Sequence, residues 1–249
     1  MTFPARDLLN NWDQQQNAYI AHREERFTAA LDVLAMTFGD DFHVVDVACG
    51  PGSFSLRLLN RFPNARVTAI DLDPLLLTLA KEAMIEHKDR IQFIHADIAL
   101  PTCFDAVEGK PQAMVSSTAI HWLLPEQQTV LYRNIYHTLD QGGLFINADH
   151  QRFDNRNPRQ KLMAQMHDEL TQEQGWAAGA QDWDTWFEAA TRHPELAEKM
   201  DERTAIFAGR PMPLPTPIEF QLAMLRLAGF DETGTVWQFL DDYVIAGWK

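Results

Sequence analysis

The chain contains very little cysteine. Cys49 and Cys103 are the two cysteines among 249 residues, which is too few for a framework of disulfide bonds. Cys49 lies inside a glycine-containing turn, and the first residues lack the basic-then-apolar order of a signal peptide. Together these features predict a reducing, cytoplasmic compartment.

Basic residues and long apolar runs are also scarce. The chain has 21 Lys and Arg against 35 Asp and Glu, which gives a formal net charge of −14. Nucleic-acid binding relies on clustered basic side chains that neutralise phosphates, so no nucleic-acid partner is expected. No apolar run approaches the roughly 20 residues that a membrane-spanning helix needs, so no membrane partner is expected either.

Strand-like and helix-like stretches alternate along the middle of the chain. Strand-like runs occupy 42–47, 66–71, 91–95, 112–117 and 143–148, and helical patterns occupy 53–62, 74–88, 125–139 and 217–228. Such alternation is typical of βαβ units around a parallel sheet. The length suffices for a substantial core, and we predict one domain over 1–249.

Other helical regions flank this alternating pattern. Region 1–40 contains a predicted helix over 8–37, and we expect the region to form an N-terminal lid. Region 150–215, rich in Trp and Met, is expected to form a helical cap inserted after the fifth strand, where it can exclude water from a ligand. Two last strand-like runs, 233–239 and 243–248, predict an antiparallel hairpin because their connection is short.

The most informative segment is 43–55. An apolar run ends at Asp46, and Gly50 and Gly52 then precede a stretch with a helical pattern. Glycine lets the backbone turn tightly and lets a ligand approach closely, and the start of a helix offers unpaired N–H groups. Asp71 ends the next strand about 20 residues later, where an acid accepts hydrogen bonds from ribose hydroxyls. The segment therefore predicts a nucleotide-type cofactor site.

A nicotinamide dinucleotide also binds a glycine turn, but this chain departs from that pattern. Ser55 stands where the dinucleotide fingerprint has Gly or Ala. Asp46 directly precedes the turn, where a carboxylate repels a pyrophosphate and suits a cationic ligand. The chain also ends in the predicted hairpin and not in a further parallel unit. A nicotinamide-dependent oxidoreductase is therefore the alternative and not the main hypothesis.

These segments resemble the class I S-adenosylmethionine-dependent methyltransferases. Residues 46–52 look like the first motif of that family, with Ala48 replacing its usual first glycine, and 69–71 look like the acidic end of its second strand. Further motifs follow in order at 95–98, 112–124 and 141–145. The resemblance implies an α/β, Rossmann-like fold with a seven-stranded sheet of order 3-2-1-4-5-7-6, in which strand 7 is antiparallel.

The resemblance also implies S-adenosylmethionine as the cofactor. In that family the second-strand acid binds ribose, which corresponds to Asp71 here, and a later Asp contacts the adenine amino group, which corresponds to Asp97. The implied cofactor-binding residues are Asp46, Ala48, Cys49, Gly50, Gly52, Asp71, Leu72, Asp97, Ile98, Ser116 and Trp122.

The acceptor site is expected after the fourth strand and in the cap. The run 116–122 ends in His121 and Trp122, and it resembles methyltransferases that esterify small carboxylic acids, such as the trans-aconitate, malonyl-carrier-protein and juvenile-hormone-acid enzymes. His121 would orient a carboxylate or act as general base toward a hydroxyl; alternatively, it packs beside Trp122 and fixes the loop. His150, after the fifth strand, is a second candidate for the acceptor pocket.

Positive charge gathers at the start of the cap, in Arg152, Arg156, Arg159 and Lys161. This cluster indicates either an anion-binding surface or a solvated helix face. No histidine pair has a nearby carboxylate at a convincing spacing, so no metal site is predicted.

We therefore predict methyl transfer to a carboxylate or hydroxyl oxygen of a small-molecule acceptor, by a monomer or homodimer. A non-catalytic cofactor-binding protein of the same fold, or an enzyme that modifies adenosylmethionine itself, stays open as an alternative.

Overall fold

A seven-stranded mixed sheet forms the centre of the protein. The computed structural model describes residues 3–249, so the first two residues of the expected lid lie outside the described residues. The strands are β1 (His43–Val47), β2 (Arg66–Asp71), β3 (Ile91–His95), β4 (Ala113–Ser117), β5 (Leu144–His150), β6 (Glu232–Phe239) and β7 (Asp242–Trp248). Their order is β3-β2-β1-β4-β5-β7-β6, and β7 pairs antiparallel with both β5 and β6. The predicted fold and strand order are confirmed.

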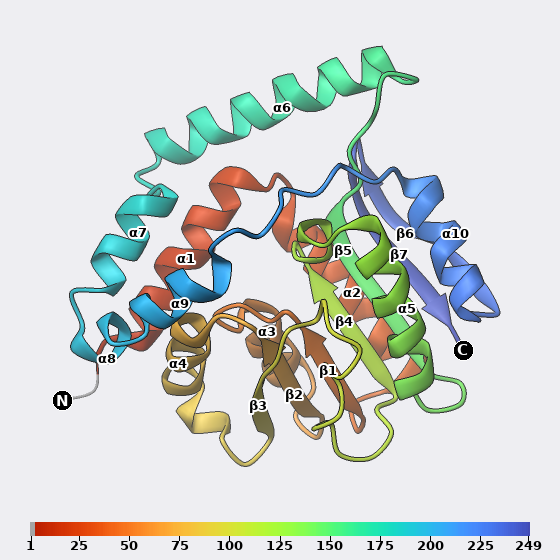
Figure 1. Cartoon of the computed structure of the whole chain (residues 1–249), viewed down its shortest axis with the longest axis horizontal. Coiled ribbons are helices and arrows are strands. Elements are labelled where there is room, and N and C mark those ends of the chain that lie inside the picture. The colour runs from red at the N-terminus through yellow and green to blue at the C-terminus, as the bar shows by residue number, and fades with distance from the viewer. Residues whose placement is uncertain (1–2) are drawn as a thin grey trace.

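Helices cover both faces of this sheet. They are α1 (Ala5–Tyr19), α2 (Arg23–Phe38), α3 (Ser53–Arg61), α4 (Pro74–Ala83), α5 (Pro125–Thr138), α6 (Pro158–Ala177), α7 (Trp183–Ala190), α8 (Pro194–Ala197), α9 (Met200–Phe207) and α10 (Ile218–Ala228), with 3-10 turns η1 (Ile85–His87) and η2 (Ile120–Trp122). Figure 1 shows α5 and α10 on one side of the sheet, with α2 and α3 on the other.

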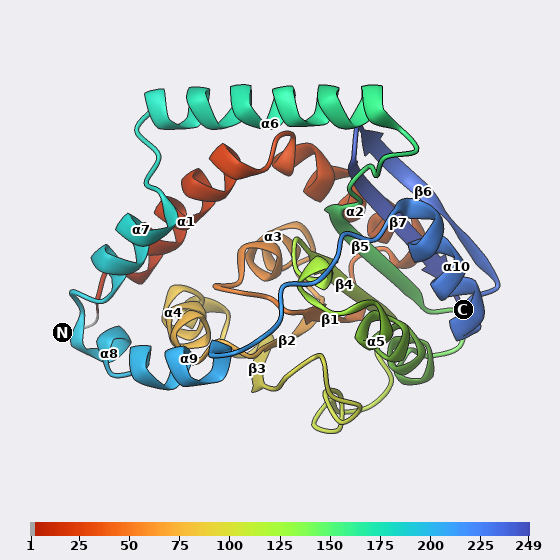
Figure 2. The ribbon, with the colours of Figure 1, turned by 45° about the horizontal axis from the view of Figure 1, so that its top comes forward.

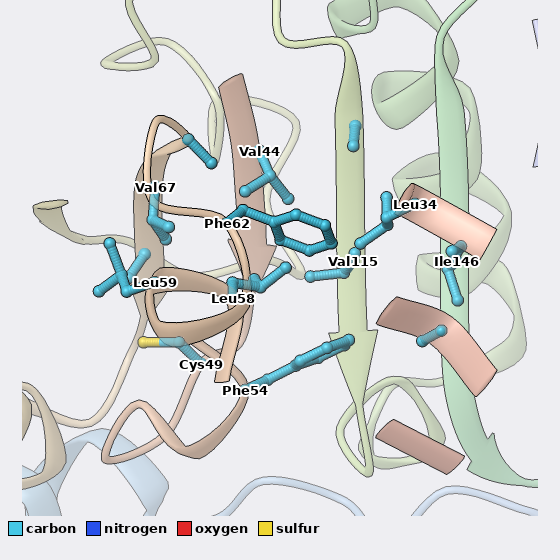
Figure 3. Close-up of a cluster of buried hydrophobic side chains, with 14 of the residues drawn as sticks. Leu34, Val44, Cys49, Phe54, Leu58, Leu59, Phe62, Val67, Val115 and Ile146 are labelled. Carbon is cyan, nitrogen blue, oxygen red and sulfur yellow. The ribbon is translucent and has the colours of Figure 1, made fainter. Parts of the chain in front are cut away.

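The strands are buried on both faces because each face packs against helices. Val44 and its neighbour Val45 are both fully buried, yet they belong to clusters on opposite faces. Figure 3 shows Phe54 and Leu58 of α3 among strand side chains of the cluster that contains Val44. Full burial of such a side chain contributes about 2 kcal/mol. This packing fixes the sheet and, with it, the edge at which the parallel strands end.

The predicted helix over 8–37 is wrong in one respect, because it is two helices. α1 ends at Tyr19, and the backbone at His22 adopts a left-handed conformation with φ of 56° before α2 begins. Such a conformation is unfavourable inside a right-handed helix. The break lets α1 lie against α4 and α6 while α2 packs on the sheet.

The chain after β5 forms α6 to α9 and then an extended strap, 208–217. Figure 2 shows α6 running along α1, and the strap returning from α9 across the molecule to α10. α6 and α1 approach so closely that a Cβ on Gly175 would lie 2.3 Å from the Cβ of Ala18. None of the described helices has both the length and the apolar character needed to cross a membrane.

Candidate functional site

A cavity of about 440 Å³ lies at the carboxyl ends of the parallel strands. Open α/β sheets bind their ligands at this edge. The cavity floor is formed by residues that follow β1, β2 and β3 and by the end of β4, including Asp71 and Ser117. The walls come from α1, α2, α7, α9 and the strap, including Trp12 and Trp183. The sheet therefore supplies one side of the site, and helices from regions 1–40 and 150–215 supply the other.

The turn after β1 adopts the left-handed backbone that its glycines allow. Residues Ala48, Gly50 and Gly52 have φ of 58°, 56° and 88°. A Cβ on Gly50 would meet no atom within 4 Å, whereas one on Gly52 would lie 2.1 Å from the Cε of Met84. Gly50 thus leaves open space at the cavity, and Gly52 permits the close packing of the turn against α4.

Asp71 is tied to this turn. Its Oδ2 accepts a hydrogen bond from the Gly50 N–H at 2.7 Å, and its Oδ1 accepts one from the Asp73 N–H at 2.8 Å. Burial nevertheless raises the pKa of Asp71 to about 6, because desolvation opposes the charged form more than these hydrogen bonds favour it. The buried carboxylate is therefore stabilised by any ligand that donates hydrogen bonds to it.

Asp46 is a second buried carboxyl group on the cavity floor. It is 1% exposed, and its Oδ2 accepts a hydrogen bond from the Ser55 Oγ at 2.6 Å. Burial raises the pKa of Asp46 to about 7, although the hydrogen bonds from Ser55 oppose this shift. Ser55, which departs from the dinucleotide fingerprint, thus has a structural partner in this chain. A positively charged ligand near Asp46 would favour its ionised form.

The cap is held to the cavity floor by two arginines. Arg210 of the strap donates from Nη2 to Asp97 Oδ2 at 2.5 Å, and Asp97 Oδ1 accepts from the Ala99 N–H at 2.9 Å. Arg203 of α9 donates from Nε to Asp73 Oδ2 at 2.6 Å. These pairs connect segments more than 100 residues apart in the chain, so they fix the strap and α9 over the ends of β2 and β3.

Most of the predicted cofactor residues meet in this one cavity. It is lined by Asp46, Ala48, Cys49, Gly50, Asp71, Leu72, Asp97, Ile98 and Trp122. Gly52 lies in the same turn but packs against α4. Ser116 is fully buried and donates from Oγ to the Val47 carbonyl at 2.8 Å, and its neighbour Ser117 lines the cavity instead.

His121 lies beside the cavity and not among its lining residues. It belongs to η2, between the cavity-lining residues Ala119 and Trp122. Its Nδ1 is 2.6 Å from Asp149 Oδ1, and its backbone N–H donates to the other oxygen of Asp149 at 3.2 Å. Asp149 is fully buried, but His121 and His150 overcome that desolvation and lower the pKa of Asp149 to about 2.

The contact with Asp149 fixes the tautomer of the His121 ring. Because Asp149 is ionised over the physiological range, it accepts the hydrogen bond and His121 Nδ1 carries the proton. The Nε2 atom of neutral His121 is then left with its lone pair, as a general base requires. The sequence did not point to Asp149, since its pairing with His121 joins β5 to the turn after β4.

His150 belongs to a buried polar network beside His121. The two rings lie 5.8 Å apart, and His150 Nδ1 is 2.6 Å from Asp242 Oδ1. Arg26 of α2 donates to Asp242 at 3.2 Å and to the Thr118 Oγ at 3.3 Å. Thr118 lines the cavity and has a left-handed φ of 54°. The network therefore connects the end of β4 to β7, and His150, like His121, stands outside the lining.

Several lining residues were not among the predicted site residues. They are side chains of the lid and cap, namely Trp12, Gln16, Arg23, Phe27, Trp183, Arg203, Phe207, Arg210 and Met212. Trp12 and Trp183 were visible as aromatic residues of predicted helices, but helical spacing does not distinguish a core aromatic from a cavity wall.

Part of the chain matches a known protein family. Residues 44–143, from β1 to the turn before β5, match a protein family described as "Methyltransferase domain". The match therefore covers the parallel part of the sheet as far as β4. The resemblance to class I S-adenosylmethionine-dependent methyltransferases is thereby confirmed, and the matched range includes the glycine turn, Asp71, Asp97 and His121.

Two relatives align with different fractions of this chain. A trans-aconitate 2-methyltransferase of Azoarcus sp. (strain BH72) is 30% identical over 156 residues, covering 62% of this chain and 56% of that protein. A carboxy-S-adenosyl-L-methionine synthase of Nautilia profundicola is 20% identical over 233 residues, covering 94% and 88%. The chain spans about half the length of the first relatives that it matches.

Solved structures support the fold across the whole chain. An O-methyltransferase family protein from Burkholderia thailandensis superposes with a TM-score of 0.60 at 14% identity, covering 97% of this chain and 68% of that one.

In residues 3–249, no three His, Cys, Asp or Glu side chains are grouped so as to hold a metal ion.

Proposed function

We propose that this protein transfers a methyl group from S-adenosylmethionine to an oxygen atom of a small-molecule acceptor. The observation that carries this proposal is that the carboxyl groups of Asp46, Asp71 and Asp97 line one cavity together with the Gly50 turn. The hydrogen-bonded pair of His121 and Asp149 lies beside this cavity. The name of the similar structure from Burkholderia thailandensis, an O-methyltransferase family protein, supports the choice of oxygen.

The floor of the cavity fits this cofactor. Gly50 leaves room for close approach of a ligand, Asp71 offers oxygens to ribose hydroxyls, and Asp97 offers one to the adenine amino group. Asp46 brings negative charge to the floor, which suits the cationic sulfonium. When bound, S-adenosylmethionine supplies an electrophilic methyl group.

The residues around the cavity orient the acceptor and manage its proton. Methyl transfer is an in-line displacement, so alignment of the acceptor contributes most of the catalysis. For a hydroxyl acceptor, His121 Nε2 takes the hydroxyl proton while Asp149 stabilises the imidazolium that forms. A carboxylate acceptor needs no base, and His121 then positions it. Regions 1–40 and 150–215 act as a lid and cap that exclude water.

Calorimetry with S-adenosylhomocysteine tests the cofactor site, and labelled S-adenosylmethionine with trans-aconitate, malonate, catechol and esculetin tests the transfer. We expect S-adenosylhomocysteine to bind tightly and at least one of these acceptors to become labelled. Absence of binding, or binding with no labelled product, would contradict the proposal.

The role of His121 is tested in the same assay. Removal of a general base typically lowers kcat about 100-fold or more, so His121→Ala should show this loss on a hydroxyl acceptor with unchanged binding of S-adenosylhomocysteine. Asp149→Asn should lower kcat and shift its pH profile. The exposed His137→Ala variant on α5 is the matched control. Unchanged kcat in His121→Ala would remove the proposed base.

A second candidate is modification of the cofactor itself. The carboxy-S-adenosyl-L-methionine synthase relative aligns over 94% of this chain, including the lid and cap regions that the 44–143 match leaves out. Mass spectrometry of the adenosyl product separates the two candidates, because methyl transfer yields S-adenosylhomocysteine and modification yields a heavier adenosylmethionine.

A further inference from the structure

The walls of the cavity carry information on the acceptor. Resting on the proposed function, we infer that the acceptor is a flat, largely apolar molecule with a hydroxyl group, and not a small polycarboxylate. This inference departs from the substrate in the names of the trans-aconitate relatives. It depends on two independent features, the aromatic walls and the pairing of the wall arginines.

The first feature is the group of aromatic side chains that line the cavity. Trp12 of α1 lies 5.2 Å from Trp183 of α7, measured between ring centroids, and both line the cavity. Phe27 of α2 and Phe207 of α9 line it as well. Aromatic rings favour flat partners, which stack on their faces or meet them edge to face.

Part of this wall is exposed apolar surface. Trp183 and Phe207 are each 39% exposed, although both residues line the cavity. Large apolar side chains that remain exposed together around a cavity mark a ligand-binding surface. A flat apolar acceptor would cover them, whereas a small polyanion would leave them in water.

The second feature is the pairing of the arginines. The cavity is lined by Arg23, Arg203 and Arg210. Arg203 and Arg210 are bound to floor carboxylates as described above. Arg23 donates from Nη1 to Asp13 Oδ1 at 2.9 Å, and its guanidinium lies 4.8 Å from the ring centre of Phe27.

Consequently, each arginine on the described cavity wall already has a carboxylate partner. The same wall carries the carboxyl groups of Asp46, Asp71, Asp73 and Asp97. A polycarboxylate would meet arginines whose charge is already offset by a carboxylate, and it would lie near further like charges, which costs free energy. An uncharged hydroxylated molecule meets neither obstacle, and its hydroxyl needs the base that His121 provides.

Two probes distinguish the two acceptor classes, with S-adenosylhomocysteine at saturation. Esculetin is flat, hydroxylated and free of carboxyl groups, and trans-aconitate is a small tricarboxylate. We expect esculetin to bind by calorimetry and to be methylated from S-adenosylmethionine, and we expect trans-aconitate to do neither. Binding or methylation of trans-aconitate in preference to esculetin would overturn the inference.

Variants of the wall locate the binding. Loss of one aromatic partner weakens binding about fivefold, so Trp183→Ala should weaken esculetin binding by about this factor. Phe207→Ala, on a different helix, should act in the same direction. Trp176→Ala is the matched control, because Trp176 is similarly exposed but packs on Tyr19 outside the cavity lining.

The outcomes separate this inference from the proposed function. If S-adenosylhomocysteine binds but esculetin does not, the acceptor class is wrong and the cofactor site stands. Equal weakening by the Trp183 and Trp176 variants would also contradict the inference. If S-adenosylhomocysteine fails to bind, the proposed function is wrong, and the esculetin titration of the protein alone still decides what the walls bind.

Discussion

We expect Asp46 to lower the stability of the ligand-free protein and to favour binding of the cationic cofactor. Its side chain is 1% exposed, and burial raises its pKa from the usual 3.8 to about 7. At about 1.4 kcal/mol per pKa unit, ionisation of this group in the folded protein costs about 4 kcal/mol. The substitution Asp46→Asn removes the charge and keeps an oxygen for the Ser55 hydroxyl. We therefore expect it to stabilise the protein at alkaline pH.

The sign of the pH dependence follows from proton binding. Between the unfolded value near 3.8 and the folded value near 7, folded Asp46 holds a proton that the unfolded chain has released. The free energy of unfolding therefore falls as pH rises through this window, and the full loss is present above it. The asparagine variant lacks this contribution, so the stability difference between variant and parent should grow with pH.

Urea unfolding at about pH 5 and about pH 8.5 measures this difference. We expect Asp46→Asn to gain about 3 kcal/mol more at the higher pH, while its affinity for S-adenosylmethionine falls. Asp231→Asn, which removes one negative charge from an exposed position, is the matched control and should show no such gain. A stability difference that is the same at both pH values would refute the reasoning.

Two further predictions concern the cofactor loops. Ala48 has a φ of 58°, so Ala48→Gly should raise the free energy of unfolding by about 1 kcal/mol without weakening S-adenosylhomocysteine binding; a loss of stability in urea would contradict this. Arg210 holds the Asp97 side chain in place, and a carboxylate can accept a second hydrogen bond, so Arg210→Ala should weaken S-adenosylhomocysteine binding in calorimetry; unchanged or tighter binding would contradict this.

The sheet and the cofactor side of the cavity could be predicted from the sequence because their signals are local. Val44 and Val45 belong to an apolar run that is buried on both faces, and the glycine turn follows it directly. Asp71 and Asp97 end or follow such runs at spacings that a single strand and turn determine. The geometry of parallel strands then brings these positions to one edge, so no long-range contact had to be inferred.

The parts that could not be predicted depend on contacts between distant segments. The break at His22 divides a pattern that is helical on both sides, and no proline or glycine marks it. The pairing of His121 with Asp149 and that of Arg210 with Asp97 join segments 28 and 113 residues apart. No sequence spacing predicts either pair, because the sheet order brings His121 to Asp149 and the path of the strap brings Arg210 to Asp97.

The basic cluster at the start of the cap shows why composition alone did not indicate the acceptor. Arg152 pairs with Asp168 at 2.8 Å and with Asp241 at 3.1 Å, and Arg156 pairs with Asp154 at 2.9 Å. These arginines fix the cap and do not line the cavity. An arginine whose charge is offset by a fixed carboxylate attracts an acceptor carboxylate less strongly. The preference of a site for a charged or uncharged acceptor therefore depends on the partners that the fold gives to each arginine. In this cavity those partners favour an uncharged molecule.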